Sequence, residues 1–358
     1  MTDKLTLLVL DGDGIGPEIT AAALEVLRAA EAAFGLPLAL QRAEVGWAAL
    51  KQEGSTFPES VAQAALAADG VVLGPISHND YPPSGEGGLN PSGEMRKRLD
   101  LYANIRPART RAGLPSPTGK SFDLVIAREN TEGFYADRTM FLGNGEFMPT
   151  PDLALAVRKI TREGSRRIAR AAFTLAKGRR KKVTAVHKAN VLRVSDGLFL
   201  AEARKMAEAN PDIEYEEQIV DAAAALLIRE PERYDVLVTT NMFGDILSDE
   251  ASELSGGLGL AASINAGDDH AMAQAQHGSA PAIAGKDLAN PSSLIGSLAM
   301  LLAWLSERHG IASLGEAGRA IERELDRLVA SPDTRTPDLG GTLGTAAFGA
   351  ALAARLSA

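Results

Sequence analysis

Two aspartates, Asp245 and Asp249, stand four residues apart in a segment with a helical pattern. That spacing places both carboxylates on one face of a helix, about one turn apart. Like charges at this spacing repel each other, whereas a hard divalent cation with oxygen ligands would reverse the sign of the interaction. Two solvated acids are the ordinary alternative. The pair follows a predicted strand at 236–240, however, and open α/β sheets bind ligands beyond the carboxyl ends of strands. This position weakens the ordinary alternative and makes the pair a candidate metal site.

Three arginines are candidates for binding an anionic substrate. Arg96 and Arg106 flank an amphipathic segment, and Arg128 directly follows a predicted strand at 123–127. Guanidinium groups bind carboxylates through two parallel hydrogen bonds, so three converging arginines would suit a di- or tricarboxylate. Surface arginines are common, and the sequence alone does not show that these three converge.

Lys188 and Tyr135 are candidates for proton transfer. Lys188 follows a predicted strand at 182–186 and precedes an apolar turn. Burial there would lower the pKa of the lysine, which is how a lysine becomes a general base near neutrality. Tyr135 lies seven residues after Arg128 and could act as a general acid. A solvated loop lysine and a packing aromatic are the alternatives.

Two loops could approach a cofactor. Gly12, Gly14 and Gly16 follow a strand and open a helix, but Pro17 stands where the dinucleotide fingerprint needs its next glycine. These glycines therefore indicate a tight strand-to-helix loop that can still touch a cofactor. The segment 277–286 is rich in small residues and would allow close backbone approach to a ligand, or form a plain surface loop.

Composition excludes several classes of function. The chain has 358 residues, 45% of them hydrophobic, and a formal net charge of −9, so a general nucleic-acid or membrane-surface binder is not expected. It contains no cysteine, which excludes disulfides, thiol nucleophiles and zinc–thiolate sites and is compatible with a reducing cytoplasm. No signal-peptide layout is present, and the apolar run 294–305 is too short to span a bilayer. We expect a cytoplasmic protein with a sizeable core.

Strand-like and helical patterns alternate along the chain, which predicts an α/β architecture. Besides the strands already named, we expect strands at 5–10 and 70–74 and helices at 17–34, 153–177, 198–209 and from 292. The segment 140–148 carries apolar residues around Asn144-Gly145, a turn signal that predicts a β-hairpin arm. Because an isolated hairpin is marginally stable, we expect this arm to pack on a partner subunit.

Taken together, these segments resemble the β-decarboxylating dehydrogenases of hydroxyacids, a family that includes isopropylmalate, isocitrate, homoisocitrate and tartrate dehydrogenases. The branch that the chain most resembles is that of the 3-isopropylmalate and homoisocitrate enzymes. The shared segments follow one another in the family's order: 11–18, 96–107, 128–135, 187–192, Asp221, 239–249, 256–259, 277–291 and 335–341.

The resemblance implies an isopropylmalate-dehydrogenase-like two-domain α/β fold with a discontinuous first domain, a central cleft and a hairpin arm. The first, cofactor-side domain would comprise 1–101 and 256–358. The second domain, 102–255, would carry the dimer contacts and the arm at about 136–152.

The resemblance also implies roles for individual residues. Mg²⁺ or Mn²⁺ would be held by Asp245, Asp249 and Asp221 of the partner subunit, so the catalytic unit would be a homodimer with shared active sites. The three arginines would hold the substrate carboxylates. Lys188 of the partner subunit would accept the hydroxyl proton through water as hydride leaves for a nicotinamide cofactor, and Asp221 is implied as a further catalytic residue. After loss of CO₂, Tyr135 would protonate the carbon. Implied cofactor contacts are Ile15, Ser77, His78, Asn190, His277, Gly278, Ser279, Ala280, Ala282, Ile283 and Asn290.

Two departures from the family pattern bear on specificity. NAD-using relatives carry an aspartate where this chain has Ala282, and NADP-using isocitrate enzymes carry lysine and tyrosine where it has Ala282 and Ile283. The missing lysine and tyrosine favour NAD. Isopropylmalate enzymes place leucines before the first arginine, whereas this chain has Asn90 and Ser92, which resemble the isocitrate pattern in swapped order.

The substrate therefore stays open between 3-isopropylmalate and isocitrate, homoisocitrate or tartrate. Two alternatives of another class remain. A silent regulatory subunit would require loss of a catalytic residue, and Tyr135, Lys188 and the aspartates are all retained. An anion-binding module without chemistry would bind its ligand without a metal.

Overall fold

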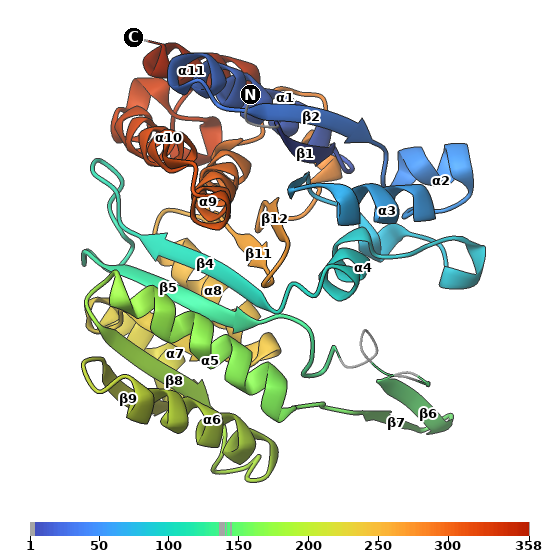
Figure 1. Ribbon diagram of the computed structural model, residues 1–358, viewed down its shortest axis with the longest axis vertical. Helices are drawn as coiled ribbons and strands as arrows, with labels where there is room; N and C mark the ends of the chain where they lie inside the picture. The colour runs from blue at the N-terminus through green and yellow to red at the C-terminus, as the bar shows by residue number, and fades with distance from the viewer. Residues whose placement is uncertain (1–3, 136–139, 141, 144, 358) are drawn as a thin grey trace. The chain divides into compact units, whose positions relative to one another are not determined.

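The computed structural model describes residues 4–135, 140, 142–143 and 145–357. The chain forms two compact units. Unit 1 comprises 1–99, 111–115 and 256–358, and unit 2 comprises 100–110 and 116–255. The chain thus leaves unit 1 and later returns to it. Relative to the predicted ranges, residues 100–101 fall in unit 2 and residues 111–115 fall in unit 1. Figure 1 labels the helices and strands.

Unit 1 is an α/β unit around five strands in the order β2-β1-β3-β12-β11. Strands β1 and β2, β1 and β3, and β3 and β12 pair in parallel, and β11 pairs antiparallel with β12. The strands are β1 (Leu5–Leu10), β2 (Leu38–Ala43), β3 (Gly70–Leu73), β11 (Ile264–Ala266) and β12 (Ala271–Gln274). The helices are α1 (Gly16–Phe34), α2 (Trp47–Glu53), α3 (Glu59–Ala67), α4 (Pro91–Arg98), α9 (Ser292–His309), α10 (Ala312–Ala330) and α11 (Thr345–Leu356).

Apart from the hairpin strands β6 and β7, the described residues of unit 2 form five strands of one sheet in the order β4-β5-β10-β8-β9. All pairs are parallel except β4 with β5. The strands are β4 (Ala103–Arg109), β5 (Asp123–Glu129), β8 (Lys182–His187), β9 (Glu214–Ile219) and β10 (Val236–Thr239). Helices α5 (Arg162–Lys177) and α6 (Ser195–Ala209) cover one face, and α7 (Val220–Arg229) and α8 (Asn241–Leu254) cover the other (Figure 1).

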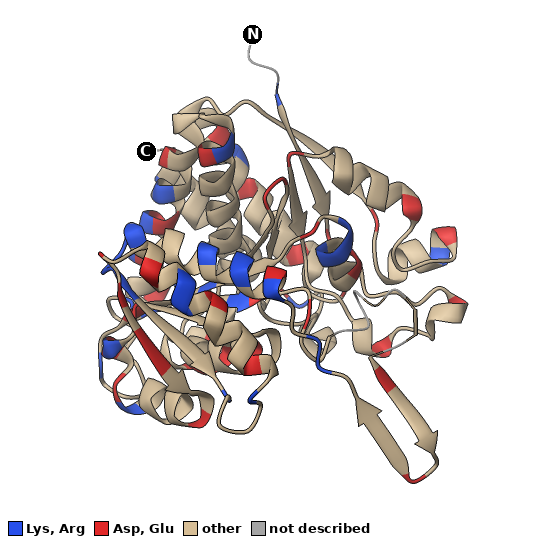
Figure 2. Cartoon of the chain, turned by 60° about the horizontal axis from the view of Figure 1, so that its bottom comes forward, with Lys and Arg blue, Asp and Glu red and all other residues tan. Residues whose placement is uncertain are grey.

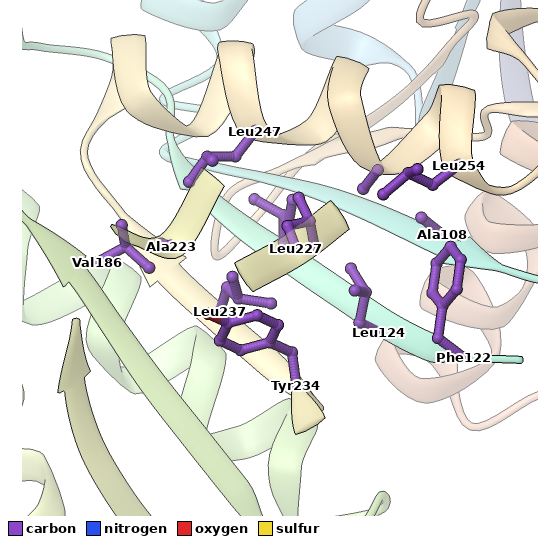
Figure 3. Packing of buried hydrophobic residues seen from close by; sticks show 12 residues of the cluster. Ala108, Phe122, Leu124, Val186, Ala223, Leu227, Tyr234, Leu237, Leu247 and Leu254 are labelled. Atoms are coloured by element: carbon purple, nitrogen blue, oxygen red, sulfur yellow. The ribbon is translucent and has the colours of Figure 1, made fainter. Parts of the chain in front are cut away.

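A hydrophobic core holds α7 and α8 on this sheet. Leu237 of β10, Leu227 of α7 and Leu247 of α8 are fully buried together, and Tyr234 lies beside them (Figure 3). Along α8 the buried residues 243, 247, 251 and 254 recur every three or four positions, which is the pattern of a helix with one apolar face. This packing fixes where the rest of α8 points.

One predicted element is wrong. Residues 153–177 do not form one long helix, because β7 (Leu153–Ala156) pairs antiparallel with β6 (Glu146–Thr150) and α5 begins only at Arg162. The hairpin arm is present, but its connection lies at 151–152 and not at Asn144-Gly145. Residues 136–139, 141 and 144 of the predicted arm lie outside the described residues.

The arm carries apolar side chains in solvent. Phe147, Met148, Leu153 and Leu155 are all exposed, and both strands are almost free of charged residues (Figure 2). Two paired strands with exposed apolar side chains leave surface that another chain could bury.

Among the described residues, no helix is both long and apolar enough to cross a membrane.

Candidate functional site

The candidate chemical residues of unit 2 meet at the carboxyl ends of its parallel strands. Arg128 pairs in register with Thr239 of β10, and Thr239 pairs with Val186 of β8. Lys188 directly follows β8, and Asp221 is the second residue of α7, the helix that directly follows β9. Open α/β sheets place their ligands at this edge, so strand order explains why residues far apart in sequence assemble here.

Asp245 is the centre of a charged cluster. Arg128 donates to Oδ1 of Asp245 through Nη1, while its Nε and Nη2 donate to Oδ1 of Asn241 at 3.0 and 2.7 Å. The Tyr135 hydroxyl donates to Oδ2 of Asp245 at 3.2 Å. Arg128 is buried, and its guanidinium carbon lies 5.8 Å from the centre of the Tyr135 ring. Asp245, a predicted metal ligand, therefore contacts both the predicted substrate-binding residue Arg128 and the predicted acid Tyr135.

Arg106 joins the same cluster from β4. Its Nη1 donates to Oδ1 of Asp245 at 3.1 Å and to Oγ of Ser248 at 2.7 Å, and it lies 3.5 Å from Oδ1 of Asp249. Burial and the neighbouring Arg128 lower the pKa of Arg106 to about 10, so it stays charged at neutral pH. Two adjacent buried cations form an environment that favours anionic ligands.

Gly244 allows α8 to approach β5 closely enough for these contacts. A β-carbon at this position would lie 2.6 Å from Cγ and 2.7 Å from Cβ of Arg128. Any side chain would therefore push α8 away from Arg128. The glycine precedes Asp245 by one residue, so the same close approach sets the position of the carboxylate.

The donor set of α8 fits a divalent metal in part. Asp245 and Asp249 offer hard carboxylate oxygens one helical turn apart, and both side chains are partly exposed. Within the described residues of one chain, no group of three or more His, Cys, Asp or Glu side chains could hold a metal ion. Two carboxylate ligands are thus available on α8.

Lys188 and Asp221 form a separate pair. Nζ of Lys188 donates to Oδ1 of Asp221 at 2.5 Å, and this hydrogen bond holds the pKa of Asp221 below its usual range. Asn190 lies in the exposed turn that follows. Both members of the pair reach solvent, Lys188 with 27% and Asp221 with 68% of the side chain exposed. A partner subunit could therefore reach them.

The candidate cofactor residues of unit 1 gather around the strand-to-helix loop after β1. Gly12 and Gly14 have left-handed backbones, and a β-carbon on Gly14 would lie 2.0 Å from the Ser279 carbonyl oxygen. The Ile15 N–H donates to that oxygen at 2.9 Å. The hydroxyls of Ser77 and Ser279 are 2.7 Å apart. The glycines thus form the tight loop that was predicted.

Asp13 anchors this loop, and sequence reasoning missed it. Its buried carboxylate accepts hydrogen bonds from the N–H groups of Ser77 and Trp47, both at 2.9 Å, and from the Tyr81 hydroxyl. The exposed His78 follows Ser77 directly. Asp13 sits between two glycines with left-handed backbones, and an acid in so tight a loop was the one available signal.

The loop 277–283 offers backbone and small side chains. Gly278, Ala280 and Ala282 are exposed and Ile283 is half-buried. Nε2 of His277 is buried and has no hydrogen-bond partner among the described residues, and burial lowers the pKa of this histidine. A buried orphaned ring nitrogen beside exposed small residues fits a loop that receives a ligand.

Asn290 is held inside unit 1 by its own contacts. It is buried, donates to Asp338 at 3.0 Å and accepts from the Ser292 N–H at 3.0 Å. The predicted motif at 335–341 thus supports the predicted cofactor residue.

The residues predicted to read the substrate also have internal partners. Oδ1 of Asn90 accepts the Gly93 N–H at 3.0 Å and caps α4. The buried Ser92 hydroxyl donates to Oε1 of Gln274 at 2.9 Å. Arg96 lies in the last turn of α4 and is half-buried. Asn90 and Ser92 therefore each form one hydrogen bond within unit 1.

Comparison with known proteins gives a consistent result. The sequence matches the family model of isocitrate/isopropylmalate dehydrogenase over residues 6–352. It is 43% identical over 345 residues to an isocitrate/homoisocitrate dehydrogenase of Thermus thermophilus, covering 96% of each chain. It is 40% identical over 354 residues to a 3-isopropylmalate dehydrogenase of Methanothermobacter thermautotrophicus, covering 99% of each. The crystal structure of isocitrate dehydrogenase from Methylococcus capsulatus is similar with a TM-score of 0.87 at 39% identity, over 99% of this chain and 100% of that one.

Proposed function

We propose that this chain, which belongs to the isocitrate/isopropylmalate dehydrogenase family, uses NAD⁺ and Mg²⁺ or Mn²⁺ to convert a 2-hydroxy-3-carboxy acid into a 2-oxo acid, CO₂ and NADH. Family membership makes it an oxidoreductase that acts on hydroxyacids and a β-decarboxylating dehydrogenase of the isocitrate, isopropylmalate or homoisocitrate type. The cofactor, the metal, the substrate and the residue roles are the proposal.

The observation that carries the proposal is the charge balance around Asp245. Arg106 and Arg128 contribute two positive charges, and Asp245 and Asp249 contribute two negative charges, within direct contact of one another. Adding a divalent cation would leave the cluster with two excess positive charges. A substrate with two carboxylates would then be matched in charge as well as in hydrogen bonding.

The metal would be held by Asp245, Asp249 and Asp221 of the partner subunit. When bound, it would supply a Lewis acid to the C2 oxygen of the substrate. Arg106, Arg128 and Arg96 would orient the two carboxylates. Arg106 and Arg128 are buried and tied to Asn104 and Asn241, so these two guanidinium groups are already oriented before substrate binds.

Lys188 and Tyr135 would move the protons. Lys188 of the partner subunit, next to its Asp221, would accept the C2 hydroxyl proton while hydride passes from C2 to the nicotinamide. The C3 carboxylate then leaves as CO₂, and the electron pair of the broken bond remains on the substrate as an enolate. The Tyr135 hydroxyl, which donates to Asp245 in this chain, would deliver its proton to C3.

NAD⁺ is favoured over NADP⁺ because position 282 carries no cation. Ala282 and Ile283 form the 3-10 turn Pro281–Ile283, and neither side chain can pair with a 2′-phosphate. The Ala282 side chain also cannot accept hydrogen bonds from the ribose hydroxyls, as an aspartate would. The proposed cofactor contacts are Ile15, Ser77, His78, Asn190, His277, Gly278, Ser279, Ala280, Ala282, Ile283 and Asn290.

The leading substrate class is 3-isopropylmalate and related alkylmalates, and a tricarboxylate is the second candidate. Asn90 and Ser92 already have partners in the fold, which lowers the cost of placing an alkyl group beside them. The second candidate is favoured by Nδ2 of Asn90, because the cap uses only its Oδ1. An amide N–H could donate to a third carboxylate.

A homodimer is part of the proposal. The exposed apolar arm and the solvent-reaching Lys188–Asp221 pair both support it. In the part of one chain that the structure describes, Asp245 and Asp249 belong to no group of three potential metal ligands, which favours Asp221 of the partner subunit as the third.

The test is a substrate panel with purified protein and Mn²⁺, run with NAD⁺ and with NADP⁺. The panel contains 3-isopropylmalate, 3-methylmalate, isocitrate, homoisocitrate and tartrate, and reduced cofactor is followed at 340 nm. We expect turnover of at least one compound, faster with NAD⁺. No turnover of any compound would reject the enzyme proposal in favour of a regulatory subunit. Ligand affinity that is independent of Mn²⁺ would instead support an anion-binding module.

A further inference from the structure

A buried ion pair outside the candidate site connects two of its parts. Asp196, the second residue of α6, is fully buried. Its Oδ2 accepts the backbone N–H of Lys188 at 2.5 Å, and its Oδ1 accepts from Nη1 of Arg158 at 2.5 Å. The carboxylate therefore holds the first residue after β8 in place through the main chain.

Arg158 carries the connection to α8. Its side chain is only 8% exposed. Nη2 donates to Oγ1 of Thr240 at 2.9 Å, and the guanidinium carbon lies 5.4 Å from the centre of the Phe243 ring. Thr240 is the N-cap residue of α8, the helix that carries Asp245 and Asp249.

The geometry requires an arginine at this position. One guanidinium nitrogen binds Asp196 and Ser195, and another binds Thr240, while the flat group packs near an aromatic ring. Lysine offers a single ammonium and cannot reproduce this fork. A buried ion pair costs desolvation free energy and is weak support for stability, so a role in orienting its neighbours accounts for it better.

We propose that Arg158 and Asp196 are positioning residues that hold the Lys188 turn and the start of α8 in one fixed arrangement. This inference rests on the proposed function, in which Lys188 serves the partner's active site while Asp245 and Asp249 serve the site of their own chain. The ion pair therefore couples the two active sites of the dimer, because a shift in one site's metal helix is transmitted to the lysine of the other.

The first test compares homodimeric variants. Arg158→Met and Asp196→Asn should lower kcat by about ten- to a hundredfold, the cost of a misplacement of about 1 Å, and change KM for the hydroxyacid less than threefold. Arg158→Lys should recover part of kcat, because it restores the charge beside Asp196 but not the fork. The matched control is Arg162→Met, which breaks an ion pair between α5 and Glu202 of α6 that does not involve Lys188 or Thr240. It should leave kcat unchanged.

The second test uses mixed dimers with one working site. One chain carries Lys188→Met and the other carries Asp245→Asn. One site of this dimer then combines the intact Asp245 of the first chain with the intact Lys188 of the second. The other site lacks both residues. Arg158→Met is then placed in either chain. The coupling predicts that each placement lowers kcat about tenfold, since one displaces the metal helix and the other displaces the lysine.

Three results would contradict the coupling of the two active sites. An effect from one placement only, or from neither, would overturn the coupling, and so would variants that change only the melting temperature. Mixed dimers that regain no activity, although homodimers of the unmodified chain are active, would reject shared active sites and the coupling with them. If the unmodified protein is inactive, by contrast, it is the proposed function that is wrong, and the coupling that rests on it fails with it.

Discussion

Nη1 of Arg106 donates a hydrogen bond of 3.1 Å to Oδ1 of Asp245. In the proposed function, Arg106 binds substrate and Asp245 binds metal. The two roles are therefore in competition within the protein, because a carboxylate that neutralises an arginine is less available to a cation. Binding of substrate to Arg106 would release Asp245 for the metal, which makes metal and substrate binding mutually favourable.

Replacing Arg106 should separate these two roles. Arg106→Met removes its hydrogen bonds to Asp245 and Ser248. We expect KM for the hydroxyacid to rise roughly a hundredfold, from the loss of about 3 kcal/mol of charge-assisted hydrogen bonding. Mn²⁺ affinity without substrate should increase about threefold, since a nearby cation is removed. Electron paramagnetic resonance of free Mn²⁺ measures the latter. Arg111→Met, which breaks the pair with Asp326 in unit 1, is the control; weaker Mn²⁺ binding in Arg106→Met would contradict the competition.

Gly244 offers a test of how closely α8 must approach β5. In Gly244→Ala the new methyl group would lie 2.6 Å from Cγ of Arg128. We expect a loss of about 1–3 kcal/mol in unfolding free energy from overpacking, together with a raised KM for substrate. The control is Gly197→Ala in α6, where a β-carbon meets nothing within 4 Å; it should stabilise the helix slightly. Equal stability and KM of the two variants would refute the close-packing argument.

Asn90 allows the two substrate classes to be distinguished. Asn90→Asp keeps the side-chain oxygen that caps α4, so stability should change by less than about 0.5 kcal/mol. It replaces the amide donor with a negative charge. If a tricarboxylate is the substrate, kcat/KM should fall at least about tenfold through repulsion of the third carboxylate. If an alkylmalate is the substrate, kcat/KM should hardly change. Asn90→Ala, which loses the cap but adds no charge, is the control that separates an effect of lost stability from an effect of charge repulsion. A fall in kcat/KM as large in Asn90→Ala as in Asn90→Asp would argue against repulsion.

Glu132 should give the fold a pH dependence. It is buried and accepts two hydrogen bonds from Thr161, both at 2.8 Å, and burial together with the nearby Glu129 raises its pKa to about 7. Between pH 4.5 and 7 the folded chain holds a proton that the unfolded chain has released, so stability falls as pH rises through this window. Glu132→Gln cannot titrate.

Relative to the natural chain, the Glu132→Gln variant should therefore gain about 1–3 kcal/mol in unfolding free energy between pH 5 and pH 8. Denaturant unfolding at the two pH values measures the difference. The exposed neighbour Glu163, whose pKa is lowered by Arg166, provides the control Glu163→Gln, which should show no such gain. A stability difference that is the same at both pH values would contradict the assignment.

The sequence was sufficient to locate most of the α/β framework, because buried strands and amphipathic helices have strong periodic signals. The strand before Asp245, the helix that carries it and the tight loop at Gly12 and Gly14 all follow from local pattern and turn chemistry. The family and its reaction type followed from the order of motifs and are confirmed by the comparisons.

Other features depend on tertiary contacts and could not be read locally. Residues 153–156 contain leucine and alanine, which favour helix, yet they pair with β6. The N-cap at Thr161, whose hydroxyl accepts the Gly164 N–H, was a usable signal that the helix begins later. Arg158 and Asp196 are 38 residues apart and form no motif, so only the fold reveals their pairing.

The most direct test of the central claim is the stoichiometry of the products. The reaction with the best compound of the panel should be run with Mn²⁺, and NADH and CO₂ should be measured in the same sample. We predict one CO₂ for each NADH, and no formation of either after chelation of the metal. NADH without CO₂, or equal turnover in the presence of a chelator, would contradict a metal-dependent oxidative decarboxylation at Asp245 and Asp249.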